Sequence, residues 1–174
     1  MLPLGHLSAS YLLTKLSKKL SLKEILLIVF AGFVLDFDIF IGVALDKSHH
    51  DLITHTPFGA IIVWLILVLI FKNISSFAKL LTLTSLILHL ILDEIGYWFY
   101  VLKFQTIVNQ PQISWLYPLK PLFNRSVPSS FCSIGSFIWL YLNNAWANVL
   151  LEIILFGAAL LILGINYKNS RINK

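Results

Sequence analysis

Long apolar stretches alternate with short polar connections along this chain, and they predict helices that cross a membrane. The main stretches lie near residues 22–45, 57–71, 80–102 and 145–166. Each approaches the roughly 20 residues that a helix needs to span about 30 Å of hydrocarbon. A shorter segment at 4–17 carries Ser8, Ser10 and Thr14, which predicts a half-length or re-entrant helix. We therefore expect an all-α integral membrane bundle of four or five helices.

Composition supports this expectation and favours a single domain over residues 1–174. The chain is 58% hydrophobic and only 12% charged, with a mean hydropathy of +0.85, which is typical of membrane proteins. Residues 103–133 are rich in proline, so we expect an irregular segment outside the membrane. The single cysteine, Cys132, excludes a disulfide within the chain.

The basic residues predict the orientation of the helices. Nine of the 13 Lys and Arg residues lie between the first two helices, between the third and fourth, or after the last one: Lys15, Lys18, Lys19, Lys23, Lys72, Lys79, Lys168, Arg171 and Lys174. The positive-inside rule places these segments in the cytoplasm. It also explains the net charge of +5 without a nucleic-acid partner. Trp98, Trp115, Trp139 and Trp146 then lie near the outer face, as in an interfacial aromatic belt.

Ionisable residues inside the apolar stretches are the strongest functional signal. All five histidines and all five aspartates precede residue 94. A charged group near the bilayer centre costs about 2.5–3.5 kcal/mol on the mildest scale, so such groups default to function. Counted from the lysine boundaries, His6, Asp36, His55, His89 and Asp93 all lie about 14–25 Å from the inner surface. Four helices therefore bring polar groups to one layer in the outer half of the membrane, as a metal site requires.

The spacing of these residues indicates how they could share a site. His89 and Asp93 are four residues apart, which puts both on one helix face as two metal ligands or as a ligand and its orienting carboxylate. A histidine–aspartate pair that only satisfies itself is the alternative. Asp36 and Asp38 point about 200° apart on a regular helix. Both face one site only if the helix is distorted, which Gly32 and Gly42 would allow. A helix that has ended by Asp36, with both aspartates in solvent, is the alternative.

The connection before the third helix supplies two further candidate ligands, His50 and His55. His49 is a spare candidate, and a polar extracytoplasmic connector is the alternative for this segment. His6 is a lone histidine that either binds the metal or lies at the interface. Glu94 points about 100° away from Asp93 and is not assigned as a ligand.

Residues 103–133 contain no acidic residue and carry Lys120 and Arg125. This positive charge favours an anionic, phosphate-bearing substrate, with Lys120 and Arg125 as its binding residues. An outer segment lying on lipid headgroups is an equally good interpretation.

Taken in order, these motifs resemble the bacterial membrane-bound metal-dependent hydrolases of the LexA-regulated inner-membrane type, also called YdjM-like. His6 is similar to the N-terminal histidine of that family, and Leu35-Asp36-Phe37-Asp38 to its Pro-Asp-x-Asp element with Leu for Pro. His50-Asp51-Leu52-Ile53-Thr54-His55-Thr56 matches its next motif, with Asp51 in place of the usual Arg. His89-x-x-x-Asp93 and Trp115-Leu116-Tyr117-Pro118 follow. The resemblance spans residues 1–120 and implies an enzyme of the inner membrane.

The expected function is a membrane-bound hydrolase that acts on a phosphoester of a lipid or lipid-linked substrate from the extracytoplasmic side. We expect one or two divalent ions, with zinc as the expected metal and manganese or iron as alternatives. Their expected ligands are His6, Asp36, His50, His55, His89 and Asp93. Asp36 and Asp38 are the expected catalytic residues, with Asp38 bridging two ions or acting as a base. Two other functions stay open: a metal or proton transporter with a His/Asp relay, and a structural membrane protein with a bound ion.

Overall fold

The computed structural model describes residues 2–17, 19–105, 110–125 and 142–172. Within these ranges the regular secondary structure is helical, with no β-strand, which confirms the all-α prediction, and residues 110–125 are irregular. Some of the residues used above, Lys18, Cys132, Trp139 and Lys174, lie outside the described residues, as does much of the segment expected to be irregular.

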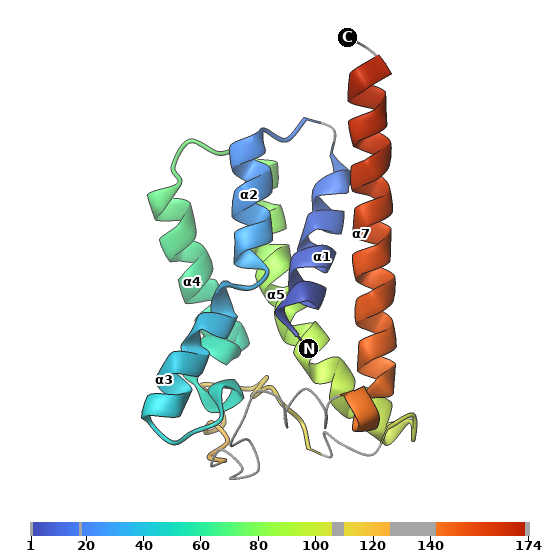
Figure 1. Cartoon of the computed structure of the whole chain (residues 1–174). Coiled ribbons are helices and arrows are strands. Elements are labelled where there is room, and N and C mark those ends of the chain that lie inside the picture. The colour runs from blue at the N-terminus through green and yellow to red at the C-terminus, as the bar shows by residue number, and fades with distance from the viewer. Residues whose placement is uncertain (1, 18, 106–109, 126–141, 173–174) are drawn as a thin grey trace.

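Five longer helices lie alongside one another, with short helical turns at one end (Figure 1). The elements in chain order are α1 (Pro3–Leu13), η1 (Thr14–Leu16), α2 (Leu22–Ala31), η2 (Val34–Asp38), α3 (Ile39–Ala44), η3 (His49–Asp51), η4 (Ile53–His55), α4 (Pro57–Ile70), α5 (Ser76–Val101) and α7 (Trp146–Ile172). The elements η3 and η4, α3 and the segment 110–125 gather at the lower end of the view. The C-terminus lies at the opposite end.

Two helices among the described residues are long and apolar enough to cross a membrane, namely α5 and the Trp146–Asn166 part of α7. The pair formed by α2 and the η2–α3 segment qualifies as a third span if it is counted as one. The helix α4 is apolar but has only 14 residues, and α1 has 11. The structure therefore supports a membrane-type chain with at least two apolar spans.

The helix expected over residues 22–45 is interrupted in the structure. It ends at Ala31, and the axis bends by 49° before the chain continues through η2 and α3. Gly32 lies at this break against α1, where an added Cβ would be only 1.8 Å from Ser10 Oγ. The distortion predicted from Gly32 is thus present. The helix α5 also begins earlier than the expected residue 80, because Ser75 Oγ accepts a hydrogen bond from the Ala78 N–H and caps it.

Small and hydroxyl-bearing residues let α1, α2 and α5 pack closely. Ser85 Oγ of α5 lies 2.7 Å from Ser10 Oγ of α1 and 2.9 Å from the Ile28 carbonyl oxygen of α2. Small residues at helix contacts are the usual means of close packing in membrane bundles. The core beside them is apolar and includes Leu27, Ile28, Leu81, Leu86 and Leu90.

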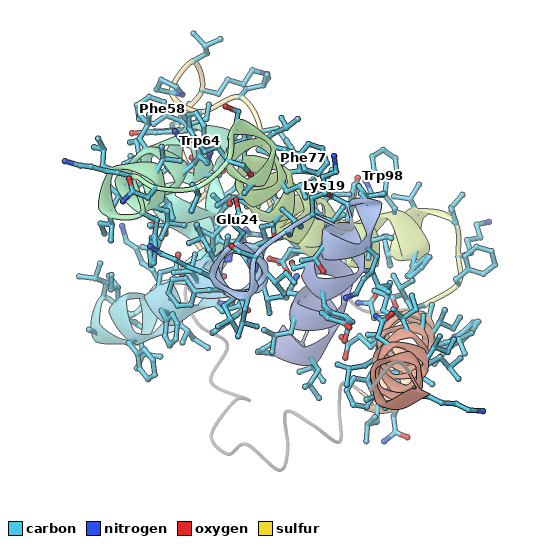
Figure 2. The ribbon with its side chains drawn as sticks, turned by 90° about the horizontal axis from the view of Figure 1, so that it is seen from above. Lys19, Glu24, Phe58, Trp64, Phe77 and Trp98 are labelled. Carbon is cyan, nitrogen blue, oxygen red and sulfur yellow. The ribbon has the colours of Figure 1, made fainter. Side chains whose placement is uncertain are left out.

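A buried carboxylate joins the N-terminal ends of α2 and α5. Glu24 accepts hydrogen bonds from the backbone N–H of Ser21, at 2.8 Å, and from that of Ser75, at 2.8 Å. It therefore caps α2 and holds the start of α5 beside it. Figure 2 views the bundle from this end, with Glu24 among the helices and Phe77 and Trp98 on the outer surface.

Candidate metal site

Eight histidine and aspartate side chains from five separate elements meet beside the bend after α2. They are His6 of α1, Asp36 and Asp38 of η2, His49 and His50 of η3, His55 of η4, and His89 and Asp93 of α5. We call this set the His/Asp cluster. It contains every predicted ligand, although 87 residues separate the first member from the last. The structure therefore brings the predicted residues together, and it adds His49.

Four members, His6, Asp36, His89 and Asp93, form what we call the helix group. One ligand atom of each lies within 4.8 Å of the others. His6 Nε2 lies 3.1 Å from Asp93 Oδ1, and His89 Nε2 lies 3.1 Å from Asp93 Oδ2 and 3.6 Å from Asp36 Oδ1. The rings of His6 and His89 stack at 4.0 Å between centroids. The i, i+4 pair predicted on α5 is therefore central to this group.

His49, His50 and His55 form a second set, the loop group, with ligand atoms within 4.8 Å of one another. It adjoins the helix group directly. His55 Nε2 lies 3.3 Å from His89 Nε2 and 3.6 Å from Asp93 Oδ2. His50 Nδ1 lies 3.9 Å from the same carboxylate oxygen. The two groups thus share one continuous polar interior.

Two histidines are oriented by hydrogen bonds at their far nitrogens. His89 Nδ1 lies 2.8 Å from the Gly32 carbonyl oxygen, to which it donates, and this leaves Nε2 as the acceptor facing the cluster. His55 Nδ1 lies 2.7 Å from Asp38 Oδ2, which also accepts a hydrogen bond from the Thr54 hydroxyl. A metal-binding histidine usually donates the N–H of its other ring nitrogen to a carbonyl or carboxylate oxygen in this way.

Local sequence explains how the two aspartates and His55 reach these positions. Asp36 and Asp38 point in different directions, and each contacts a different histidine, His89 or His55. The turn η4 packs closely on α4 because Gly59 leaves room for it, since an added Cβ there would be 1.9 Å from the Ile53 carbonyl oxygen. Thr56 Oγ1 accepts from the Gly59 N–H and caps α4 at this point.

The environment keeps the two η3 histidines neutral, which is the form that binds metals. Burial, reinforced by neighbouring His55, lowers the pKa of His49 to about 4. Burial lowers the pKa of His50 well below its ordinary value as well. His55 differs: burial lowers its pKa, but Asp38 and Asp93 outweigh this and raise it to about 9. These two carboxylates would equally stabilise a cation bound at His55.

Several buried polar atoms of the cluster have no hydrogen-bond partner among the described residues. They are His6 Nδ1, Asp36 Oδ2, Asp38 Oδ1 and His50 Nδ1. Buried polar groups are normally hydrogen-bonded, so such a concentration calls for an explanation. Imidazole and carboxylate together suit a divalent transition metal. These residues therefore fit the predicted metal.

The two predicted substrate-binding residues are placed differently from each other. The Arg125 guanidinium donates to the buried Asp51 carboxylate, with Nε 2.9 Å from Oδ1, and to the carbonyl oxygens of Pro111 and Gln112. The Arg125 guanidinium is therefore already paired with groups of the protein itself. Lys120 is exposed and lines a shallow hollow of the 110–125 segment with Trp115 and Phe123.

Glu94, which the sequence left without a role, holds the same segment. Its Oε2 accepts hydrogen bonds from the backbone N–H of Gln112, at 2.8 Å, and of Ile113, at 2.9 Å. The segment is therefore fixed to α5 directly beside Asp93, and to η3 through Asp51. No sequence motif predicted these contacts. The position of Glu94, next to the predicted ligand Asp93 on an apolar helix, was the signal that could have indicated them.

The sequence also missed the supporting roles of Gly32 and Thr54. Gly32 indicated a distortion of the helix, but nothing in the pattern showed that its carbonyl would face His89. Comparison of the chain with family models, with curated proteins and with solved structures finds no match.

Proposed function

We propose that this protein is a membrane-bound, metal-dependent hydrolase acting on a phosphoester of a lipid or lipid-linked substrate. The observation that carries the proposal is the meeting of His6, Asp36, His55, His89 and Asp93 in one buried cluster. A bundle that needed only structural stability would avoid so many ionisable groups in its interior. The ordered motifs, which resemble the YdjM-like hydrolases, support the same function.

Each residue has a distinct role in this proposal. The residues that would hold metal, through the oxygen and nitrogen atoms that face the cluster, are those expected from the sequence: His6, Asp36, His50, His55, His89 and Asp93. When bound, a divalent ion such as zinc acidifies water and neutralises negative charge on a phosphate. Asp38 is a positioning residue for His55, in place of the bridging or basic role expected from its sequence. Asp36 has a side chain 20% exposed, so it can contact both water and substrate.

We place the chain in the inner membrane as a helical bundle. In this arrangement α5, α7 and the bent α2–α3 pair cross the bilayer, α4 crosses most of it and α1 lies within the bundle. The lysine-rich ends face the cytoplasm, as the positive-inside rule favours. The His/Asp cluster then opens to the extracytoplasmic side.

A lipid substrate is supported by the surface next to the cluster. The helix α3 follows Asp38 directly and exposes large apolar side chains, with Phe40 71% and Val43 70% exposed. Such a surface suits acyl chains rather than water. Lys120, exposed on the 110–125 segment, offers a positive charge for the phosphate.

The first test is the metal content of the purified protein in detergent, measured by elemental mass spectrometry. The wild-type chain and an Asp46→Asn control should each hold transition metal, because Asp46 is an exposed loop residue outside the cluster. A His89→Ala, Asp93→Ala double variant should lose it. Absence of metal from the wild type, even after incubation with zinc and manganese, would overturn the proposal.

Activity is then measured on vesicles that contain phospholipids or isoprenoid phosphates, by release of the phosphorylated product. We expect turnover that depends on added metal and disappears in the double variant. Stoichiometric metal without turnover of any phosphoester would instead favour a structural ion. Metal uptake into sealed proteoliposomes would favour a transporter.

A further inference from the structure

The His/Asp cluster offers more ligand atoms than one ion can use. A catalytic zinc ion takes three protein ligands and a water molecule. The helix group alone offers four ligating residues and the loop group three more, each set within 4.8 Å. We infer that the cluster binds two divalent ions, one in each group, and that the Asp93 carboxylate bridges them. This inference rests on the proposed metal-dependent function.

The two oxygens of Asp93 face different partners, as a bridging carboxylate requires. Oδ1 lies 3.1 Å from His6 Nε2 in the helix group. Oδ2 lies 3.6 Å from His55 Nε2 and 3.9 Å from His50 Nδ1, both in the loop group. It is also 3.1 Å from His89 Nε2, so it lies on the boundary between the groups. Asp93 is therefore the one carboxylate with described contacts to both sets of histidines.

The two groups adjoin closely enough for a pair of ions. Two-metal sites that act on phosphoesters hold their ions roughly 3.5–4 Å apart. Ligands of neighbouring ions in such a site must lie close together, and His55 Nε2 and His89 Nε2 are 3.3 Å apart. Each of these histidines is oriented independently, one by Asp38 and the other by the Gly32 carbonyl. The two histidines can thus serve separate ions.

The charges in the cluster also favour two ions. Asp36, Asp38 and Asp93 bring three carboxylates into a buried site. Among the described residues, Asp36 and Asp38 contact histidines and Thr54 but no lysine or arginine. One divalent ion would leave an excess of negative charge, which repels a phosphate. Two divalent ions outweigh the three carboxylates and leave a positive site for an anionic substrate.

The test counts ions and detects their coupling without relying on activity. The full chain in detergent is titrated with Mn²⁺, and bound metal is measured by elemental mass spectrometry and by electron paramagnetic resonance. The wild type and the Asp46→Asn control should bind two Mn²⁺ per chain, with the altered spectrum of a coupled pair. A His6→Ala, His89→Ala variant and a His49→Ala, His50→Ala variant should each bind one ion, with the spectrum of isolated Mn²⁺. Asp93→Asn should abolish the coupling.

One ion per wild-type chain at saturation would overturn the two-ion inference and leave the proposed hydrolase intact. No bound ion would overturn both. Two ions without coupling would remove Asp93 as the bridge and thereby refute the inference as stated. Circular dichroism and size-exclusion profiles of the variants show whether each remains folded, and the wild-type count decides the question even where a variant does not.

Discussion

At the scale of single residues, Gly32 has two functions that a larger residue could not combine. It lets α2 approach α1 so closely that an added Cβ would lie 2.6 Å from Ser10 Cβ. Its carbonyl oxygen, 2.8 Å from His89 Nδ1, then orients that histidine. The packing of two helices and the orientation of the His89 ring therefore depend on the same backbone position.

Replacing Gly32 by alanine tests this dependence. We expect Gly32→Ala to destabilise the fold by about 1–3 kcal/mol through overpacking and to weaken metal binding as His89 shifts. Thermal unfolding in detergent and chelator competition measure the two effects. A Ser10→Gly substitution in the same chain removes the clashing side chain and should restore both properties.

Gly157→Ala provides the matched control on α7. Among the described residues, no atom outside the nearby helix backbone lies within 4 Å of an added Cβ there, so the methyl group meets open space. Alanine should leave stability unchanged or raise it by up to about 1 kcal/mol, because it is the better helix former. An equal loss of stability in both variants would contradict the role given to Gly32.

Asp38 acts through His55, so its charge should affect the metal rather than the fold. Asp38→Asn keeps the side-chain volume and an acceptor for the Thr54 hydroxyl, but it removes the negative charge 2.7 Å from His55 Nδ1. Loss of such a supporting group typically costs 10–100-fold in metal affinity. Chelator competition should give a loss in this range, and unchanged affinity would show that Asp38 does not position His55.

At the scale of elements, the 110–125 segment is attached to the walls of the site at two points. Glu94 accepts from two of its backbone N–H groups, and Arg125 joins it to Asp51 in η3. The Ser48 N–H also donates to the Arg125 carbonyl oxygen. The segment therefore fixes the position of η3, which carries His49 and His50.

A double-mutant cycle on Asp51 and Arg125 measures this attachment. The Asp51 side chain is fully buried, so Arg125→Ala leaves an unpaired buried charge and should cost about 3–5 kcal/mol. The Asp51→Asn, Arg125→Ala chain should be more stable than Arg125→Ala alone, since it no longer buries that charge. Additive losses in thermal unfolding would show that the two residues act independently.

The sequence predicted some elements well and others poorly, for physical reasons. Helix α4 was predicted closely because its apolar character is continuous and its ends are polar, whereas α7 begins near the expected residue but extends to Ile172, past the expected end at residue 166. Residues 22–45 were expected to form one helix, but the close contact of Gly32 with Ser10 breaks it, and no local pattern reveals a contact between distant segments. The meeting of these histidines and aspartates was predicted because charged groups are costly in hydrocarbon. Carbonyl and loop contacts, such as those of Gly32 and Glu94, arise only from the tertiary fold.

At the scale of the whole molecule, the proposed orientation places η3 and η4 outside and the connection between α4 and α5 inside. In a Cys132→Ser background, Lys47→Cys should react with a membrane-impermeant maleimide on intact cells. Lys72→Cys should react only after the membrane is opened. Both lysines are exposed, so burial does not account for the difference. The reverse labelling pattern would contradict the orientation and place the cluster on the cytoplasmic side.

The position of the partners of Asp36 and Asp38 has a consequence for the biosynthesis of the chain. Each aspartate costs about 2.5–3.5 kcal/mol when a helix carrying it enters the bilayer alone. Their histidine partners, His89 and His55, are synthesised later. The segment carrying α2 and α3 should therefore lack a stable position in the bilayer until α5 has emerged from the ribosome. This segment can then insert stably only together with the later segments. A chain truncated before His89 should therefore be recognised as misfolded in the membrane and degraded.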